Sequence, residues 1–431
     1  MFSKNKIVVI HIDSIRREYL SSWLLGEKFK ERGYNVLLSS RHSTWRLLKF
    51  FTPTIFVSTH PFTLKISHLE NLIKRGTKIY VNEVEGTDNE NGVSSTYPEF
   101  YLGKKIDYNI FSGIFVWGEF TYNWLLEKRK VKEKNLFLNG SIRQSKFCRP
   151  IKKQDNEIVV GIISRFEIIN TYDGRHPFEN LVSLDPEDVN LKWYYERCAI
   201  DSEAFSIVVK LIKKLIENGY RVSFRPHPNE NIAAYDILKR DFGALFTIDN
   251  SYNLNEWLSS VSIVLGNTST AFIEPFMAGI PIISISKIQK FNYTDTKIKS
   301  VLSQFDKAAY LPDTIDNAYG ICTTDNLKPQ NSDELDIYFN KFYSLKNNVD
   351  PIENIINIIG DDTKHIAQSK SKMINSFIIQ YFFLLICDVL LVIKYLIFEK
   401  SLNKLKIYKN YNYNRIFHRP SIYMKKLNHN I

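Results

Sequence analysis

The sequence predicts an α/β protein with two doubly wound parallel sheets in tandem, each covered by helices. Short apolar runs alternate with amphipathic segments from residue 7 onward, which is typical of parallel sheets covered on both faces. A polar stretch at 150–156 (PIKKQDN) interrupts this alternation, and a β-branched strand at 157–164 (EIVVGIIS) restarts it. The length of 431 residues also exceeds one ordinary core, since domains usually have about 100 to 200 residues.

These observations place a first Rossmann-like domain at 1–150, a second at 151–345, and a helical tail at 346–431. In the first domain we expect strands and helices at 7–12, 19–32 (helix), 34–39, 54–58, 69–75 (helix), 77–81, 113–119 and 135–138.

The second domain continues the pattern, and Gly219 is well placed to end its first helix. Two such domains leave a cleft between the carboxyl ends of their strands, where ligands bind. We expect the elements 157–164, 205–218 (helix), 221–224, 245–248, 254–260 (helix), 262–265, 271–278 (helix) and 281–284.

Composition supports a globular protein in a reducing compartment. Hydrophobic residues make up 44% and charged residues 24% of the chain, so most of it can bury a core. The four cysteines are scattered without C-x-x-C or metal-ligand spacing, which argues against disulfides and zinc. The start MFSKNKIVVIHID lacks the long apolar core of a signal peptide. We therefore expect a cytoplasmic location.

The first strong motif is RPHP at 225–228, directly after the strand RVSF. Arg225 and His227 lie on a proline-stiffened turn, where a guanidinium and an imidazole can bind a phosphate with little loss of loop entropy. The structural alternative is that Arg225 caps a helix and His227 is buried.

The second motif is GNTST at 266–270, between a strand and a helix. Free N–H groups at a helix start, with three hydroxyls, can hold an anion, although simple helix capping explains the same residues. One turn into the helix, Glu274 can accept hydrogen bonds from a ribose diol if it faces the cleft; the alternative is a solvated charge. The candidate anion-binding residues are Asn267, Thr268, Ser269 and Thr270.

Ser164 and Arg165 follow the first strand of the second domain. They can reach a donor phosphate or a sugar carboxylate, and a plain loop role explains them equally well. His11 and Asp13 at the end of the first strand, and the pair at 139–140 (Asn-Gly), are further candidates for the acceptor side and an interdomain hinge.

The order RPHP, strand, GNTST-x-x-x-E-P-x-x-x-G-I-P resembles the donor-binding half of GT-B glycosyltransferases. The resemblance is to bacterial surface and capsular polysaccharide enzymes, including the Kdo transferases and, more distantly, the CDP-glycerol polymerases. It implies that the HP turn and the hydroxyl-rich loop hold the nucleotide phosphates and that Glu274 holds the ribose. It implies no cofactor, because the nucleotide-sugar donor is a substrate.

The first domain adds VNEVEG at 81–86 and FVWG at 115–118, which resemble segments of surface carbohydrate biosynthesis proteins. Glycosyl transfer needs a base for the acceptor hydroxyl, and a carboxylate beside a glycine in a cleft can serve. We expect Glu85 as catalytic base and Glu83 as second choice, the alternative being an exposed acidic loop.

No D-x-D pair follows a predicted strand, since the acidic pair at 361–362 lies in the tail. Metal-free chemistry is therefore expected, with Arg225, His227 and helix dipoles stabilising the leaving phosphate.

The tail contains a largely apolar segment at 373–398 and then a basic end. From Glu399 onward there are eight Lys or Arg against that one acid, a net +7 of the chain's +11. A basic end beside an apolar segment favours an anionic membrane surface over nucleic acid. The uncharged part, 373–387, is shorter than the roughly 20 residues of a bilayer span. In-plane binding at the inner face of the plasma membrane is expected; a buried helix and a true span are the alternatives.

The sequence thus predicts a glycosyltransferase acting on a surface polysaccharide, lipopolysaccharide or lipid-linked glycan. The resemblance suggests a CMP-linked ulosonic acid, such as Kdo or a sialic acid, as donor, with UDP- and GDP-sugars open. The alternatives are a CDP-glycerol- or ribitol-type polyol-phosphate transferase and a non-catalytic GT-B binding module.

Overall fold

The fold was analysed in a computed structural model of the chain. The structure describes residues 6–12, 15–40, 44, 48, 52–58, 66–83, 107–148, 157–172, 174–182, 191–249, 251, 254–296, 305–330, 339–344 and 349–363.

The first domain contains a six-stranded parallel sheet in the order β2-β1-β3-β4-β5-β6. Its strands are buried, apolar and rich in β-branched residues, as expected for a sheet covered on both faces. The elements are β1 (Ile7–Ile12), α1 (Ile15–Glu31), β2 (Asn35–Ser40), β3 (Ile55–Ser58), α3 (Ile66–Lys74), β4 (Lys78–Asn82), β5 (Gly113–Val116), α5 (Glu119–Arg129) and β6 (Leu136–Leu138).

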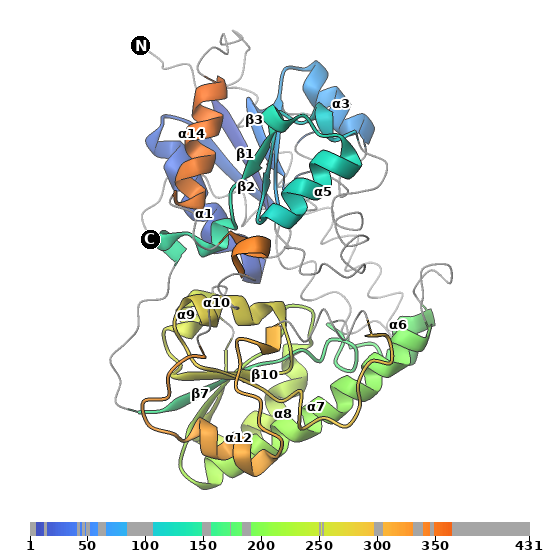
Figure 1. Ribbon diagram of the computed structural model, residues 1–431, viewed down its shortest axis with the longest axis vertical. Coiled ribbons are helices and arrows are strands. Elements are labelled where there is room, and N and C mark those ends of the chain that lie inside the picture. Colours follow the sequence, from blue (N-terminus) through green and yellow to red (C-terminus); the bar gives the residue numbers. More distant parts are fainter. Residues whose placement is uncertain are drawn as a thin grey trace, which may run out of the picture.

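The second domain contains a five-stranded parallel sheet in the order β11-β10-β7-β8-β9. The two sheets form separate lobes, one above the other in Figure 1, and the predicted α/β class is confirmed. The elements are β7 (Val159–Ile163), α6 (Pro177–Val182), α7 (Leu191–Glu217), β8 (Arg221–Arg225), α8 (Asp236–Phe242), β9 (Phe246–Ile248), α9 (Leu254–Leu258), β10 (Ile263–Gly266), α10 (Ile273–Met277), β11 (Ile282–Ser284) and α12 (Ile315–Cys322).

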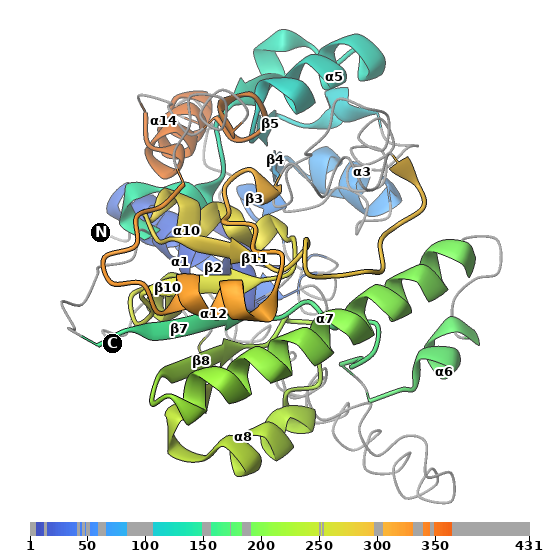
Figure 2. The same cartoon turned by 60° about the horizontal axis from the view of Figure 1, so that its bottom comes forward.

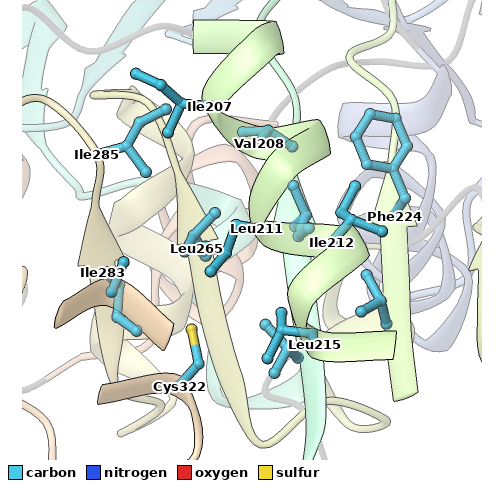
Figure 3. Close-up of a cluster of buried hydrophobic side chains, with 14 of the residues drawn as sticks. Ile207, Val208, Leu211, Ile212, Leu215, Phe224, Leu265, Ile283, Ile285 and Cys322 are labelled. Carbon is cyan, nitrogen blue, oxygen red and sulfur yellow. The ribbon is translucent and has the colours of Figure 1, made fainter. Parts of the chain in front are cut away.

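Helix α7 forms much of the core of the second domain and runs past one end of its sheet (Figure 2). Its apolar face packs on β8, β10 and the β11 region (Figure 3). The helix ends before Gly219, whose φ of +82° is the left-handed conformation expected at a C-cap. The helix begins 14 residues before its predicted start. The first half was not predicted because it buries polar and aromatic side chains, which break the apolar spacing of a helix. These are Tyr194, Arg197 and Asp201.

The last described helix, α14 (Pro351–Thr363), returns to the first domain. It lies beside α1 (Figure 1), and its four buried isoleucines join the core beneath β1 and β2. Tyr34 Oη and Thr363 Oγ1 are 2.6 Å apart, and Lys78 and Tyr80 bind the Asp362 carboxylate. Part of the predicted tail therefore completes the first domain. The isoleucines are Ile352, Ile355, Ile356 and Ile359.

The predicted membrane segment at 373–398 lies outside the described residues. Within the described ranges, which stop at residue 363, no helix has the length and hydropathy needed to cross a bilayer.

The FVWG motif of the first domain packs against the second domain and the segment that leads to α14. Trp117 is 2% exposed and lies in one apolar cluster with Phe272 and Ile273, next to helix α10, and its ring centroid is 5.8 Å from that of Tyr343. Gly118 is required for close approach, because an added Cβ would lie 2.2 Å from the Phe342 carbonyl oxygen. The motif therefore has a structural role at this contact.

Replacing Gly118→Ala should destabilise the protein by about 1 to 3 kcal/mol, since backbone atoms on both sides must move. Urea unfolding followed by tryptophan fluorescence measures this free energy.

The matched control is Gly320→Ala in helix α12, where an added Cβ meets no atom within 4 Å. This variant should match the wild type or gain about 0.5 to 1 kcal/mol. Equal stability of the two variants would show that the approach to Phe342 does not constrain the fold.

Candidate functional site

Three loops meet at the carboxyl edge of the second sheet. Strand β7 lies between β8 and β10, and all three are parallel, so the segments that follow them share one edge. The backbone N–H of His227 donates to Ser164 Oγ over 2.8 Å, and Arg165 Nη1 donates to the Thr268 carbonyl oxygen over 2.6 Å. The β7 loop therefore joins the RPHP turn to the GNTST loop, and the two motifs lie on the same side of the domain.

Arg165 is the central cation of this edge. It is partly buried, and no carboxylate among the described residues forms an ion pair with its guanidinium. Burial, with a further contribution from nearby Arg197, lowers its pKa. A guanidinium that is partly desolvated and bonded to one carbonyl oxygen retains the capacity to bind an anion.

A buried carboxylate, Glu230, fixes the two loops relative to each other. It is 1% exposed and accepts hydrogen bonds from the Ser164 hydroxyl, the Phe166 N–H, the Tyr235 hydroxyl (2.8 Å) and the His227 N–H (3.2 Å). Burial raises its pKa to about 7, against the lowering effect of these hydrogen bonds. Sequence reasoning missed Glu230, although it lies only three residues after His227.

A second set of charges lies behind the β7 loop. Arg197 is 4% exposed and donates from Nε to Asp201 (2.6 Å) and from Nη2 to Glu167 (2.9 Å). Burial opposes ionisation of Glu167, but Arg197, His227 and Arg165 together lower its pKa to about 2. Burial raises the pKa of Asp201 to about 6, with Arg197 opposing. One guanidinium thus faces two carboxylates, and Arg165 adds a further positive charge near Glu167.

Arg225, predicted to bind phosphate, is engaged by its own domain. It is 7% exposed, is paired with the Asp249 carboxylate, and donates to Ser251 Oγ over 2.9 Å. Its guanidinium carbon lies 5.9 Å from the centre of the Trp257 ring. In this arrangement Arg225 stiffens the turn, and contact with a phosphate requires it to leave Asp249.

The hydroxyls of the GNTST loop make local bonds. Thr268 Oγ1 donates to Asp306 over 2.8 Å, Ser269 Oγ accepts from Ala271 N over 3.2 Å, and Asn267 Oδ1 accepts from Thr268 N over 2.8 Å. Thr270 begins a 3₁₀ turn at Thr270–Phe272 that leads into the short helix α10. The predicted single helix over 271–278 is therefore divided.

Glu274 faces the first domain rather than an open cleft. Its side chain is 8% exposed and lies 3.4 Å from Arg143 Nη1. The Arg143 guanidinium carbon in turn lies 5.0 Å from the centre of the Trp117 ring. In this structure the predicted ribose ligand is therefore occupied by Arg143, a partner on the other domain that could not be inferred from sequence.

On the first domain, Glu83 is buried (4% exposed), with Trp117 N donating to Oε2 over 2.7 Å and the Trp117 indole to its carbonyl oxygen over 2.6 Å. Burial raises its pKa to about 8, so its carboxyl group is protonated at neutral pH. His11 is buried at the end of β1, and Asn139 accepts from Asn354 over 2.9 Å. The other candidates here, Glu85 and Asp13, lie outside the described residues.

The Glu83 carboxyl should make stability depend on pH. Because its folded pKa of about 8 exceeds the ordinary glutamate value of 4.5, the stability it contributes is complete below pH 4.5 and is lost as pH rises through 8. Glu83→Gln keeps the acceptor for Trp117 N and cannot ionise. The variant should match the wild type near pH 5 and exceed it by roughly 3 to 5 kcal/mol well above pH 8. Urea unfolding at pH 5, 7 and 9 measures the difference, and a constant difference across this range would contradict a buried neutral carboxyl.

Comparison with known proteins places the fold. No protein-family model and no curated protein sequence matches the chain. Among solved structures, it is similar to the wall teichoic acid polymerase TagF, H548A, with a TM-score of 0.51, 11% identity, 86% of this chain and 91% of that chain covered.

Two further structures resemble the chain less well. One is the S. aureus MnaA-UDP co-structure, with a TM-score of 0.47, 10% identity, 83% of this chain and 96% of that chain covered. The other is a putative UDP-N-acetylglucosamine 2-epimerase from Listeria monocytogenes, with a TM-score of 0.48, 8% identity, 86% of this chain and 100% of that chain covered. The chain thus has the two-domain GT-B type of fold, with two parallel Rossmann-like sheets and with α14, its last described helix, packed on the first.

Proposed function

We propose that this protein is a glycosyltransferase that binds the phosphate of a nucleotide-sugar donor at the carboxyl edge of its second sheet. The observation that carries the proposal is the meeting of three loops around Arg165, on adjacent parallel strands. Ligands of open α/β sheets bind at this edge.

The ion pairs around the site support Arg165 as the residue that binds the phosphate. Arg197 and Arg225 are both neutralised by carboxylates, whereas Arg165 donates to a backbone carbonyl oxygen. An incoming phosphate would form a direct ion pair with this partly buried guanidinium and would accept a bidentate pair of hydrogen bonds. In this proposal Arg165 is therefore the main residue that binds the donor phosphate, and His227 lies beside it.

The remaining predicted roles require local rearrangement on binding. Thr268 must exchange Asp306 for the ligand, and Glu274 must leave Arg143 before it can hold a ribose. Because Glu274 and Arg143 belong to different domains, ribose binding would be coupled to the domain contact. Glu85 remains the proposed base, since the Glu83 carboxyl is buried and protonated at neutral pH.

The proposed reaction transfers a sugar to a surface glycan or lipid-linked acceptor. The leaving phosphate would be stabilised by Arg165, His227 and backbone N–H groups without a divalent cation, so turnover should persist in EDTA. We further propose that the chain works at the inner face of the plasma membrane, which its apolar and basic C-terminal segments would contact.

The nucleotide is identified by saturation-transfer NMR of CMP, CDP, UDP and GDP with the full chain. Arg165→Ala should weaken the binding of whichever nucleotide gives a saturation-transfer signal, by about 10- to 100-fold. Arg165→Lys should recover part of the loss. Arg240→Ala is the control, because Arg240 is an exposed arginine on α8 whose ion-pair partner among the described residues is Asp241.

Absence of binding by all four nucleotides would contradict the proposal, as would equal binding by the wild type and Arg165→Ala. Release of a polyol phosphate rather than a sugar from candidate donors would assign the same site to a polyol-phosphate transferase. Binding without turnover on any acceptor would point to a binding module.

A further inference from the structure

His227 makes a backbone contact that restricts where its proton lies. The N–H of Asn229 donates to His227 Nδ1 over 3.2 Å. A backbone N–H is only a donor, so Nδ1 must present its lone pair. A neutral imidazole then carries its proton on Nε2.

The Glu167 carboxylate is the competing influence, since it would favour a charged imidazolium. Its Oε2 lies 3.9 Å from His227 Nδ1, which is beyond the usual hydrogen-bond range of about 2.7 to 3.2 Å. Glu167 is paired with Arg197 at 2.9 Å through its other oxygen, Oε1, whereas Oε2 has no hydrogen-bond partner among the described residues. The shorter contact, from Asn229 to Nδ1, therefore determines the protonation of the ring.

Three arginines near His227 oppose a positive charge on its ring. Arg165 comes from the β7 loop, Arg197 from α7 and Arg17 from the first turn of α1, while Glu230 binds the backbone N–H of His227. Burial has the largest effect, and with the three arginines it lowers the pKa of His227 to about 4 against the opposing effect of Glu167.

The Nε2 atom of the ring has no hydrogen-bond partner among the described residues, and a third of the His227 side chain (34%) is exposed. This nitrogen is therefore an accessible donor beside Arg165.

We infer that His227 is a neutral hydrogen-bond donor, held in the Nε2–H form by the backbone of Asn229, and that it binds the donor phosphate without adding charge. The identity of the ligand rests on the proposed function, whereas the protonation state does not. Arg165 then supplies the positive charge of the site, and the Nε2–H group of His227 orients the phosphate through a directional hydrogen bond. In this form Nε2 cannot serve as a general base, because it already carries the proton.

The first test is ¹⁵N NMR of the full chain with labelled histidine, with the His227 signal identified by its loss in His227→Gln. The expected spectrum shows protonated Nε2 and unprotonated Nδ1, unchanged between pH 5.5 and 8. A proton on Nδ1, or a protonation midpoint above pH 6, would overturn the inference whether or not any nucleotide binds.

The second test uses the nucleotide, among CMP, CDP, UDP and GDP, that binds the wild type. The amide N–H of His227→Gln can replace the Nε2 donor, so its affinity should stay within about threefold of wild type, whereas His227→Ala should lose about tenfold. Equal losses in both variants would overturn the donor role.

His176→Gln is the control in this second test. The exposed His176 makes the same local contact, accepting from Phe178 N over 3.4 Å, but lies on the turn before α6. Its replacement should leave nucleotide affinity unchanged. Failure of every nucleotide to bind the wild type would overturn the proposed ligand, and the spectrum would still decide the protonation state.

Discussion

The candidate site depends on one buried carboxylate, Glu230, which lies between the β7 and β8 loops. Its two oxygens accept from the Ser164 hydroxyl, two backbone N–H groups and the Tyr235 hydroxyl. Adjacent parallel strands bring these loops to the same edge, but their ends would otherwise be free to separate. Because the carboxyl group is buried, each of these bonds is strengthened by the low local dielectric, and losing one would leave a buried polar atom without a partner. Arg165 and His227 are held in place by this arrangement.

Around that carboxylate, the site separates charges that serve the fold from the charge that serves a ligand. Arg197 is compensated by Glu167 and Asp201, and Arg225 by Asp249, so both guanidinium groups act as internal cross-links. Arg165 differs because its partner is a carbonyl oxygen, which offers a partial charge only. A phosphate would therefore gain more from Arg165 than from either neighbour, since it need not break an existing ion pair.

Strands and motif positions could be predicted from sequence, whereas the partners of the motif residues could not. Apolar runs such as IVVIHI reveal buried strands, and residues that follow parallel strands necessarily gather at one edge. The partner of Glu274 is Arg143, 131 positions earlier in the chain, and the partner of Thr268 is Asp306. In the linear sequence, Arg143 and Asp306 resemble ordinary surface charges. Only the packing of the two domains, and of the loops after β10 and β11, brings these pairs together.

The contact between the domains is also made by residues far apart in the sequence, and it connects the two halves of the site. Glu83 binds the backbone of Trp117, the Trp117 ring lies beneath Arg143, and Arg143 pairs with Glu274. This series of contacts runs from the end of β4 to the start of α10. A ligand that draws Glu274 away from Arg143 therefore removes a restraint on the first domain. The sign of the coupling is fixed by linkage: if binding breaks this ion pair, forming the pair must weaken binding by the same factor.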